Sequence, residues 1–295
     1  MPFFGMAFTW IGCSETPAST SQAESPDGST SVTPEAGQPG DAGALSDASA
    51  DTGLSDGSTG TDGGCRALFC DDFEAHHAGQ APGAPWTVRT WQNDSQVTID
   101  GAHAHSGTNA LKVAVTAGSG KRAAVENKSP SIFPLSGNAM YGRMWIWLTQ
   151  APPDGVHWTN IQGEGPVAGQ SFRAMYRYGG MNQQRFLANY ETTNVSTDCW
   201  KESATVIPQS RWACFEWHFD GPTNQMNFWM DGTALADLTV MSTGAGCIGQ
   251  ATNGVWQAPT FDALLIGWEH YQSSSVPISM WIDDVAVAAA RVSCQ

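Results

Sequence analysis

The chain has 295 residues, of which 41% are hydrophobic and only 14% are charged, and its formal net charge is −15. The charged share is well below the roughly 25% of ordinary soluble domains, and the length suits one large domain or two small ones. No basic patch stands out in the sequence, which excludes nucleic acid as an expected partner. A polyanionic ligand would need a locally positive cleft, because the overall field repels it.

The first 13 residues are apolar and end at Cys13. Ile11, Gly12 and Cys13 fit the end of a bacterial lipobox, in which the cysteine receives a lipid. The alternative interpretation is an ordinary signal peptide that is cleaved nearby. We expect residues 1–13 to be a secretion signal and Cys13 to be lipidated, so that the protein is secreted or held at the cell surface. The lipid would be its only contact with the membrane.

Residues 14–64 contain nine acidic residues, no Lys or Arg, and no aromatic residue. Such a segment, rich in Ser, Thr, Gly, Asp, Ala and Pro, cannot bury enough apolar surface to offset the entropy lost on ordering. We therefore predict a disordered acidic linker over 14–64, a flexible stalk between the anchor and a working domain.

Residues 65–295 are predicted to form one domain of short strands. Apolar and polar residues alternate in the first of these strands, with Met144, Ile146 and Leu148 on one face. The turn pair Asp231-Gly232 follows another. The strand signals fall at 140–149, 212–220, 225–230, 261–268 and 278–287. Frequent strands without intervening helices predict an all-β fold, a sandwich of two antiparallel sheets or jelly roll.

The seven cysteines divide into six within this domain and one far upstream. They are Cys13, Cys65, Cys70, Cys199, Cys214, Cys247 and Cys294. The six cysteines of the domain indicate three disulfides, and the upstream Cys13 then has a separate role. The sequence has no CxxC or His-x-x-x-His pattern to support zinc, and paired cysteines imply an oxidising compartment.

Six short motifs occur in order along residues 70–294. They are Asp71-Asp72-Phe73-Glu74, His105-Ser106-Gly107-Thr108-Asn109, Cys214-Phe215-Glu216-Trp217-His218, Gly267-Trp268-Glu269-His270-Tyr271, Trp281-Ile282-Asp283-Asp284-Val285 and Arg291-Val292-Ser293-Cys294. In this order and spacing they resemble the Cip-type secreted proteins, first known from cellulolytic fungi and co-produced with cellulases. The resemblance implies a concanavalin-like β-jelly roll similar to that of glucuronan and alginate lyases, with a structural calcium ion.

The resemblance also implies a ligand set for that calcium ion. The matched positions are Glu74, Ser106, Asn109 and Asp283. Their oxygen atoms are the ligands that Ca²⁺ prefers, and one ion there would tie both ends of the domain together. Asp284 is the alternative to Asp283, because adjacent strand residues face opposite ways.

The resemblance further implies that Cys214 pairs with Cys294, joining a middle strand to the C-terminus. For the other four cysteines of the domain we expect Cys65 to pair with Cys70 and Cys199 with Cys247.

Cleavage of a uronic-acid chain by β-elimination needs a group that neutralises the carboxylate, a base for the C5 proton and an acid for the leaving oxygen. The candidates are His157, Gln162, Arg173, Tyr190 and Tyr271. Arg173 or Gln162 would hold the carboxylate. His157 or a tyrosine would take the proton, and Tyr271 or Tyr190 would serve the leaving oxygen. We expect these residues to converge in a cleft on the concave sheet.

Further residues are expected to contact sugar. They are Trp145, Trp147, Arg143 and Glu269, since tryptophan rings stack on sugars and polar groups bind hydroxyls. The sequence therefore predicts a monomeric extracellular protein that acts on polysaccharide, with a lyase on uronic-acid polymers as the first hypothesis. A non-catalytic carbohydrate-binding surface lipoprotein is the alternative, and a purely structural or adhesive lipoprotein is the third.

Overall fold

The computed structural model describes residues 67–249 and 252–294. The predicted signal, the predicted linker, Cys13 and Cys65 lie outside the described residues. Within the described ranges, no helix has the length and apolar character needed to cross a membrane.

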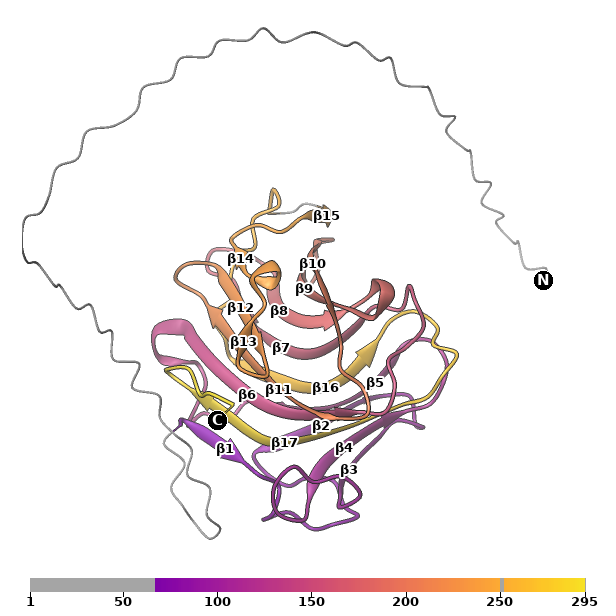
Figure 1. Ribbon diagram of the computed structural model, residues 1–295. Coiled ribbons are helices and arrows are strands. Elements are labelled where there is room, and N and C mark those ends of the chain that lie inside the picture. The colour runs from indigo at the N-terminus through magenta and orange to yellow at the C-terminus, as the bar shows by residue number, and fades with distance from the viewer. Residues whose placement is uncertain (1–66, 250–251, 295) are drawn as a thin grey trace, which may run out of the picture. The chain divides into compact units, whose positions relative to one another are not determined.

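Two antiparallel sheets make up the described part of the chain, which confirms the predicted all-β sandwich (Figure 1). In spatial order, the nine-stranded sheet contains β13 (Thr233–Ala234), β12 (Gln225–Met230), β11 (Trp212–Asp220), β6 (Ala139–Leu148), β17 (Ile278–Ala288), β4 (Ala110–Val115) and β3 (Gln96–Asp100). Two short strands join it at the side, with β1 (Phe69–Asp71) on β17 and β14 (Val240–Met241) on β12.

The eight-stranded sheet carries the candidate site. In spatial order it contains β15 (Gly246–Ile248), β10 (Asp198–Val206), β9 (Arg185–Thr192), β8 (Arg173–Gly180), β7 (Trp158–Pro166), β16 (Ala263–His270), β5 (Lys121–Asn127) and β2 (Trp86–Trp91). The described helices are single 3₁₀ turns, η1 (Ser136–Asn138), η2 (Asn182–Gln184) and η3 (Ala236–Leu238).

The core lies between the two sheets and is rich in aromatic rings. Trp158 and Trp268 stack there with ring centroids 5.8 Å apart, and both side chains are almost fully buried. Burying one such large side chain contributes on the order of 1.5–3 kcal/mol. Packing is tight enough that a Cβ at Gly142 would come within 2.0 Å of the ring of Trp217, so this strand position requires glycine.

Alternation along each strand separates the core face from the outer face of the eight-stranded sheet. On β8, Tyr176 and Tyr178 enter the core, whereas Arg173, Met175 and Arg177 point the other way. The strands are curved, and the outer face of this sheet is the concave one (Figure 1). Polar residues that share this face are therefore gathered over one hollow surface.

Two disulfides confirm two of the predicted cysteine pairs. Cys199 on β10 is bonded to Cys247, its direct cross-strand partner on β15. Cys214 on β11 is bonded to Cys294 near the C-terminus. The predicted pair of Cys65 with Cys70 involves a residue outside the described ranges.

Candidate active site

A row of polar side chains crosses the centre of the concave face. Gln162 on β7, Arg177 on β8 and Asn189 on β9 are register partners on neighbouring strands. All three are buried, with exposed fractions of 4% or less. Buried polar groups of this kind need hydrogen-bond partners: Gln162 accepts from Arg177, and Asn189 donates to Asp198 and to the carbonyl of Cys199.

Arg177 is the centre of this row. Its Nε donates to Gln162 Oε1 at 2.6 Å, and its Nη1 donates to the carboxylate of Glu191. The guanidinium carbon lies 5.9 Å from the centroid of the Tyr271 ring. The structure thus places a fixed positive charge under Tyr271, held by an amide on one side and a carboxylate on the other.

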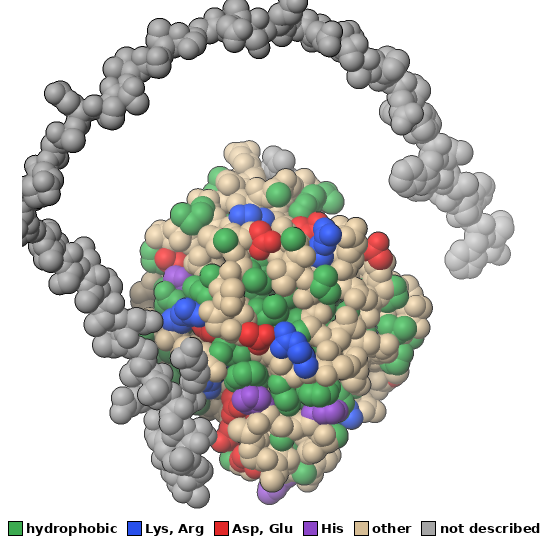
Figure 2. Space-filling view, viewed as in Figure 1, with side chains coloured by type: hydrophobic (Ala, Val, Ile, Leu, Met, Phe, Trp, Pro, Cys, Tyr) green, Lys and Arg blue, Asp and Glu red, His purple; other side chains and the backbone are tan. Residues whose placement is uncertain are grey.

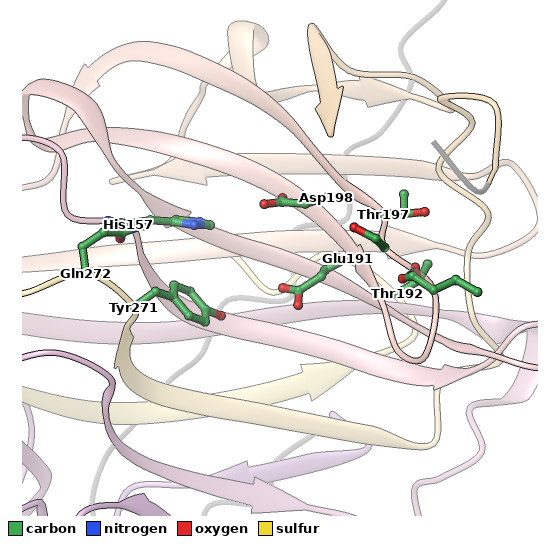
Figure 3. Close-up of a pocket in the computed structure, with 9 residues that line it drawn as sticks. His157, Glu191, Thr192, Thr197, Asp198, Tyr271 and Gln272 are labelled. Atoms are coloured by element: carbon green, nitrogen blue, oxygen red, sulfur yellow. Dashed lines mark hydrogen bonds between the residues drawn. The ribbon is translucent and has the colours of Figure 1, made fainter. Parts of the chain in front are cut away.

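His157 and Tyr271 face each other at one end of the row. His157 immediately precedes β7 and Tyr271 immediately follows β16, and the backbone N–H of Tyr271 donates to the carbonyl of His157 at 3.1 Å. Their ring centroids are 5.1 Å apart. The amide oxygen of Gln272 accepts from the His157 backbone N–H at 2.7 Å, which further fixes this corner (Figure 3).

The environment sets opposite protonation preferences for the two rings. Burial lowers the pKa of His157 to about 4, and the positive charge of Arg177 acts in the same direction against the opposing effect of Asp198. Burial raises the pKa of Tyr271 above its ordinary value, although Arg177 opposes this. At neutral pH the pair is therefore a neutral imidazole and a protonated phenol. The Tyr271 hydroxyl is buried, and an interaction with the Thr159 hydroxyl acts against the rise in its pKa.

The two rings form one wall of a pocket of about 270 Å³. The opposite wall comes from β9 and β10, where Glu191 and Asp198 are direct cross-strand partners (Figure 3). Asp198 accepts a hydrogen bond from the amide of Asn189 at 2.6 Å. Thr192 and Thr197 add hydroxyl groups to the lining. A proton acceptor and a proton donor thus face a cavity that is rich in hydrogen-bond acceptors.

Three of the five predicted catalytic residues belong to this arrangement, and the expected convergence of all five is wrong. His157 and Tyr271 line the pocket, and Gln162 binds Arg177 beside it. Arg173 shares the face but lies four residues along β8 from Arg177, which is roughly 13 Å at the usual strand rise. Its guanidinium pairs instead with Asp262 at 2.6 Å.

Tyr190 is the second correction. Its side chain is fully buried between the sheets, stacked on Trp256 with ring centroids 5.9 Å apart. Phe186 and Ala188 precede it at alternate positions of β9 and enter the same core. This alternation puts Tyr190 on the face opposite to Glu191, so it cannot reach the pocket.

Three of the four predicted sugar contacts lie on the other sheet. Arg143, Trp145 and Trp147 project from the outer face of β6, where Trp145 and Trp147 stack on histidine rings at 3.8 and 4.5 Å. Arg143 is buried and donates to the carbonyls of Asp284 and Ser293. Glu269 alone is on the concave face, paired with Arg122 at 2.5 Å.

The sequence analysis missed Arg177, Asn189, Glu191 and Asp198. A signal for two of them exists in β9, where Leu187, Asn189 and Glu191 alternate with the core residues. The two arginines of β8 are four residues apart and so share a face, which leaves the sequence unable to tell which one meets Tyr271.

The predicted calcium ligands cluster at the turn 105–109. Glu74 accepts the backbone N–H groups of Thr108 and Asn109 at 2.7 and 2.6 Å. Asp283 accepts those of His105 and Ser106 at 2.8 and 3.2 Å. Both carboxylates therefore bind the backbone of the same turn.

A β-bulge in β17 brings Asp284 into the same cluster. The register with β6 shifts after Asp283, and Asp284 has a φ of 47°. Adjacent carboxylates that would face opposite ways in a regular strand thus both turn toward residues 105–109. Ser106 Oγ donates to Asp284 at 2.7 Å. Burial and the neighbouring Asp284 raise the pKa of Asp283 to about 7.

Within the described ranges, one group of three His, Cys, Asp or Glu side chains lies close enough together to share a metal ion, namely Cys214, Glu216 and Cys294, and it does not include the predicted calcium ligands. Its two sulfurs form a disulfide and are not thiolates, so this group is not a metal site.

Basic and acidic side chains are interspersed on the surface. Ion pairs cross the concave sheet between Arg122 and Glu269 and between Arg173 and Asp262. On the face drawn in Figure 2, blue and red side chains lie next to one another and do not form a patch of one sign. A polyanion would need a locally positive cleft. On this sheet the positive charge comes from individual arginines, and they do not form a continuous positive surface.

Comparison with known families identifies the class of domain. Residues 72–290 match the Cip1-like, core domain family, which is classed as polysaccharide-lyase-like. The chain therefore belongs to the Cip1-like family, which confirms the resemblance inferred from the six motifs. A search of curated protein sequences found no match.

Two solved structures share the fold. Cellulose induced protein, Cip1, is 22% identical, with a TM-score of 0.55 over 77% of this chain and 100% of that one. The endo-β-1,4-glucuronan lyase from the fungus Trichoderma reesei is 13% identical, with a TM-score of 0.50 over 76% of this chain and 96% of that one.

Proposed function

We propose that this domain cleaves a uronic-acid-containing polysaccharide by β-elimination in the pocket beside Tyr271. The observation that supports this most is the pairing of His157 with Tyr271. One ring is neutral and able to accept a proton, and the other is protonated and able to donate one, at a ring separation of 5.1 Å. At neutral pH both rings are in the protonation states that the reaction needs, although the shifts make His157 a weaker base and Tyr271 a weaker acid than the free side chains.

Each ring has one task in the proposed reaction. The His157 imidazole takes the C5 proton of the uronate, and the electron pair left behind forms the C4–C5 double bond. The bond from C4 to the glycosidic oxygen breaks, and the Tyr271 hydroxyl gives its proton to that oxygen. His157 then loses its proton to water and Tyr271 regains one, so the net change is transfer of a proton from C5 to the leaving oxygen.

Arg177 supplies positive charge at this place. Negative charge builds on the uronate carboxylate as the C5 proton leaves, and fixed donors there lower the barrier. Arg177 lies under the Tyr271 ring and is oriented by Gln162 and Glu191. Its nitrogens bond Gln162, Glu191 and Met175, so Arg177 acts through its charge and not as a direct carboxylate contact, and Gln162 acts as a positioning residue for it.

The experiment is a screen of the full chain on uronic and neutral polysaccharides, read by the ultraviolet absorbance of the unsaturated product. We expect product from at least one uronic polymer and none from neutral glycans. Polysaccharide binding without product from any uronic polymer would contradict the lyase and favour the non-catalytic carbohydrate-binding protein. The exposed ring of Trp91, at 37%, supports that alternative as a stacking surface beside Tyr271.

We also propose that Glu74, Ser106, Asn109 and Asp283 hold a structural Ca²⁺ ion, with Asp284 beside them. The charge of the ion would offset the repulsion between Asp283 and Asp284. Bound there, it would join the segment after β1, the turn 105–109 and the last strand.

The location of the protein follows from its disulfides and its predicted signal. Two disulfides among the described residues indicate an oxidising compartment. We propose an extracellular monomer, tethered to the bacterial surface by a lipid on Cys13. Labelling with a radioactive fatty acid, with Cys13→Ser as the control, tests the tether.

A further inference from the structure

The lining of the pocket carries negative charge and no Lys or Arg. Of its nine residues, Glu191 and Asp198 are acidic, and His157 is neutral at ordinary pH because its pKa is lowered to about 4. Arg177 compensates Glu191 from beneath. Asp198 receives an amide hydrogen bond from Asn189 and forms no ion pair within the described ranges. A sugar in this pocket therefore meets at least one uncompensated carboxylate.

A uronate and a neutral sugar would respond to this lining in opposite ways. The carboxylate of a uronate would be repelled by Asp198 at short range in a partly buried site. A neutral sugar would instead donate hydroxyl hydrogen bonds to Glu191 and Asp198, and bonds to ionised acceptors are the stronger kind. The volume of about 270 Å³ is near the lower end for ligand pockets, which suits a single sugar ring.

The surface on the other side of Tyr271 is different. Trp91 contacts Tyr271 edge-on with ring centroids 6.3 Å apart, and the guanidinium of Arg122 lies 4.0 Å from the centroid of Trp91. Trp91, Arg122 and Glu269 are register partners across β2, β5 and β16. This side combines an exposed aromatic ring with the charge-balanced ion pair of Arg122 and Glu269, so unlike the pocket it does not repel a ring that carries a carboxylate.

We propose that the pocket of Glu191 and Asp198 binds a neutral sugar as the leaving group, while the uronate lies over Tyr271 toward Trp91 and Arg122. The substrate is then a polysaccharide in which uronic acid alternates with neutral sugars, and not a polyuronate. This inference rests on the proposed elimination and adds the substrate class to it.

The test compares two probes on the full chain. Hyaluronan alternates glucuronic acid with neutral N-acetylglucosamine, and glucuronan contains glucuronic acid alone. We expect kcat/KM at least tenfold higher on hyaluronan. Asp198→Asn should raise kcat/KM on glucuronan tenfold or more and lower it on hyaluronan, because the repelling charge and the charged acceptor for sugar hydroxyls are lost together. Asp220→Asn, the same charge change on β11 of the other sheet, should leave the ratio as in the wild type.

The outcomes separate this inference from the lyase itself. Glucuronan cleaved as fast as hyaluronan, or a ratio unmoved by Asp198→Asn, would overturn the neutral-sugar pocket and leave the elimination standing. If neither polymer is cleaved, the binding of hyaluronan and of glucuronan to the Tyr271→Phe variant is measured by calorimetry. Preference for hyaluronan that Asp198→Asn removes would still support the pocket, and equal or no binding would overturn it.

Discussion

Arg173 and Arg177 project from the same face of β8, yet only Arg177 lies under the ring of Tyr271. The side chain of Arg177 is 4% exposed, whereas that of Arg173 is 37% exposed and pairs with Asp262 near solvent. The two arginines are four residues apart on one strand, yet their surroundings differ. Substituting them should therefore have different consequences.

Replacing Arg177 by methionine should destabilise the domain far more than the same change at Arg173. Arg177→Met removes the donor to Gln162 Oε1 and the ion-pair partner of Glu191. Breaking a buried pair costs about 3–5 kcal/mol, and we expect the lower end because Glu191 is 36% exposed. Arg173→Met should cost about 1 kcal/mol or less. Urea unfolding measures both, and adding Glu191→Gln to Arg177→Met should recover part of the loss.

The pH dependence of activity should report His157. Because its pKa is about 4, kcat/KM should fall with acid only below about pH 5 and should be flat near neutrality. The alkaline limb should lie above pH 10, because the pKa of Tyr271 is raised from that ordinary value. An acid limb centred near pH 6.5, the ordinary histidine value, would contradict the assignment.

The stability of the folded state should depend on the same histidine. Between pH 4 and 6.5 the unfolded chain binds more protons at this site than the folded chain, so the free energy of unfolding rises with pH. His157→Gln should remove this part of the slope. Denaturant titrations at several pH values measure it, and an unchanged slope would argue that His157 is not held neutral.

Tyr271→Phe should remove turnover and leave glycan binding nearly intact. Loss of a general acid costs about 10²–10⁴-fold in rate, whereas the ring stays in place to contact sugar. Tyr141→Phe is the matched control, because Tyr141 is stacked on His218 on the other sheet at 4.0 Å. Rates from product absorbance and affinities from calorimetry give the two readouts, and loss of binding alone would mark Tyr271 as a contact residue.

Chelation should lower the melting temperature if calcium binds at the turn 105–109. An ion held only by the folded state stabilises it by about 2.7 kcal/mol at a hundredfold excess over its dissociation constant. Asp283→Asn should abolish the effect of the chelator, and Asp220→Asn should keep it. A melting curve that chelator does not move would count against the site.

The sequence by itself determined the sandwich, the family and two disulfides. Alternation in segments such as 140–149 predicts strands because side chains on a pleated strand point to opposite faces in turn. The six motifs are short stretches of sequence, so the family could be recognised from them without a structure. In β9 the alternation of Phe186, Ala188 and Tyr190 could also have placed Tyr190 in the core, since apolar residues at every second position mark the buried face.

Only the tertiary structure decided which side chains meet. Alternation puts Arg173 and Arg177 on one face, but the register of β7, β8 and β9 makes Arg177 the neighbour of Gln162 and Asn189. It also assigns β6, with Trp145 and Trp147, to the other sheet. Pairing partners far apart in the chain are set by how whole strands pack, and a local pattern of period two carries no information about them.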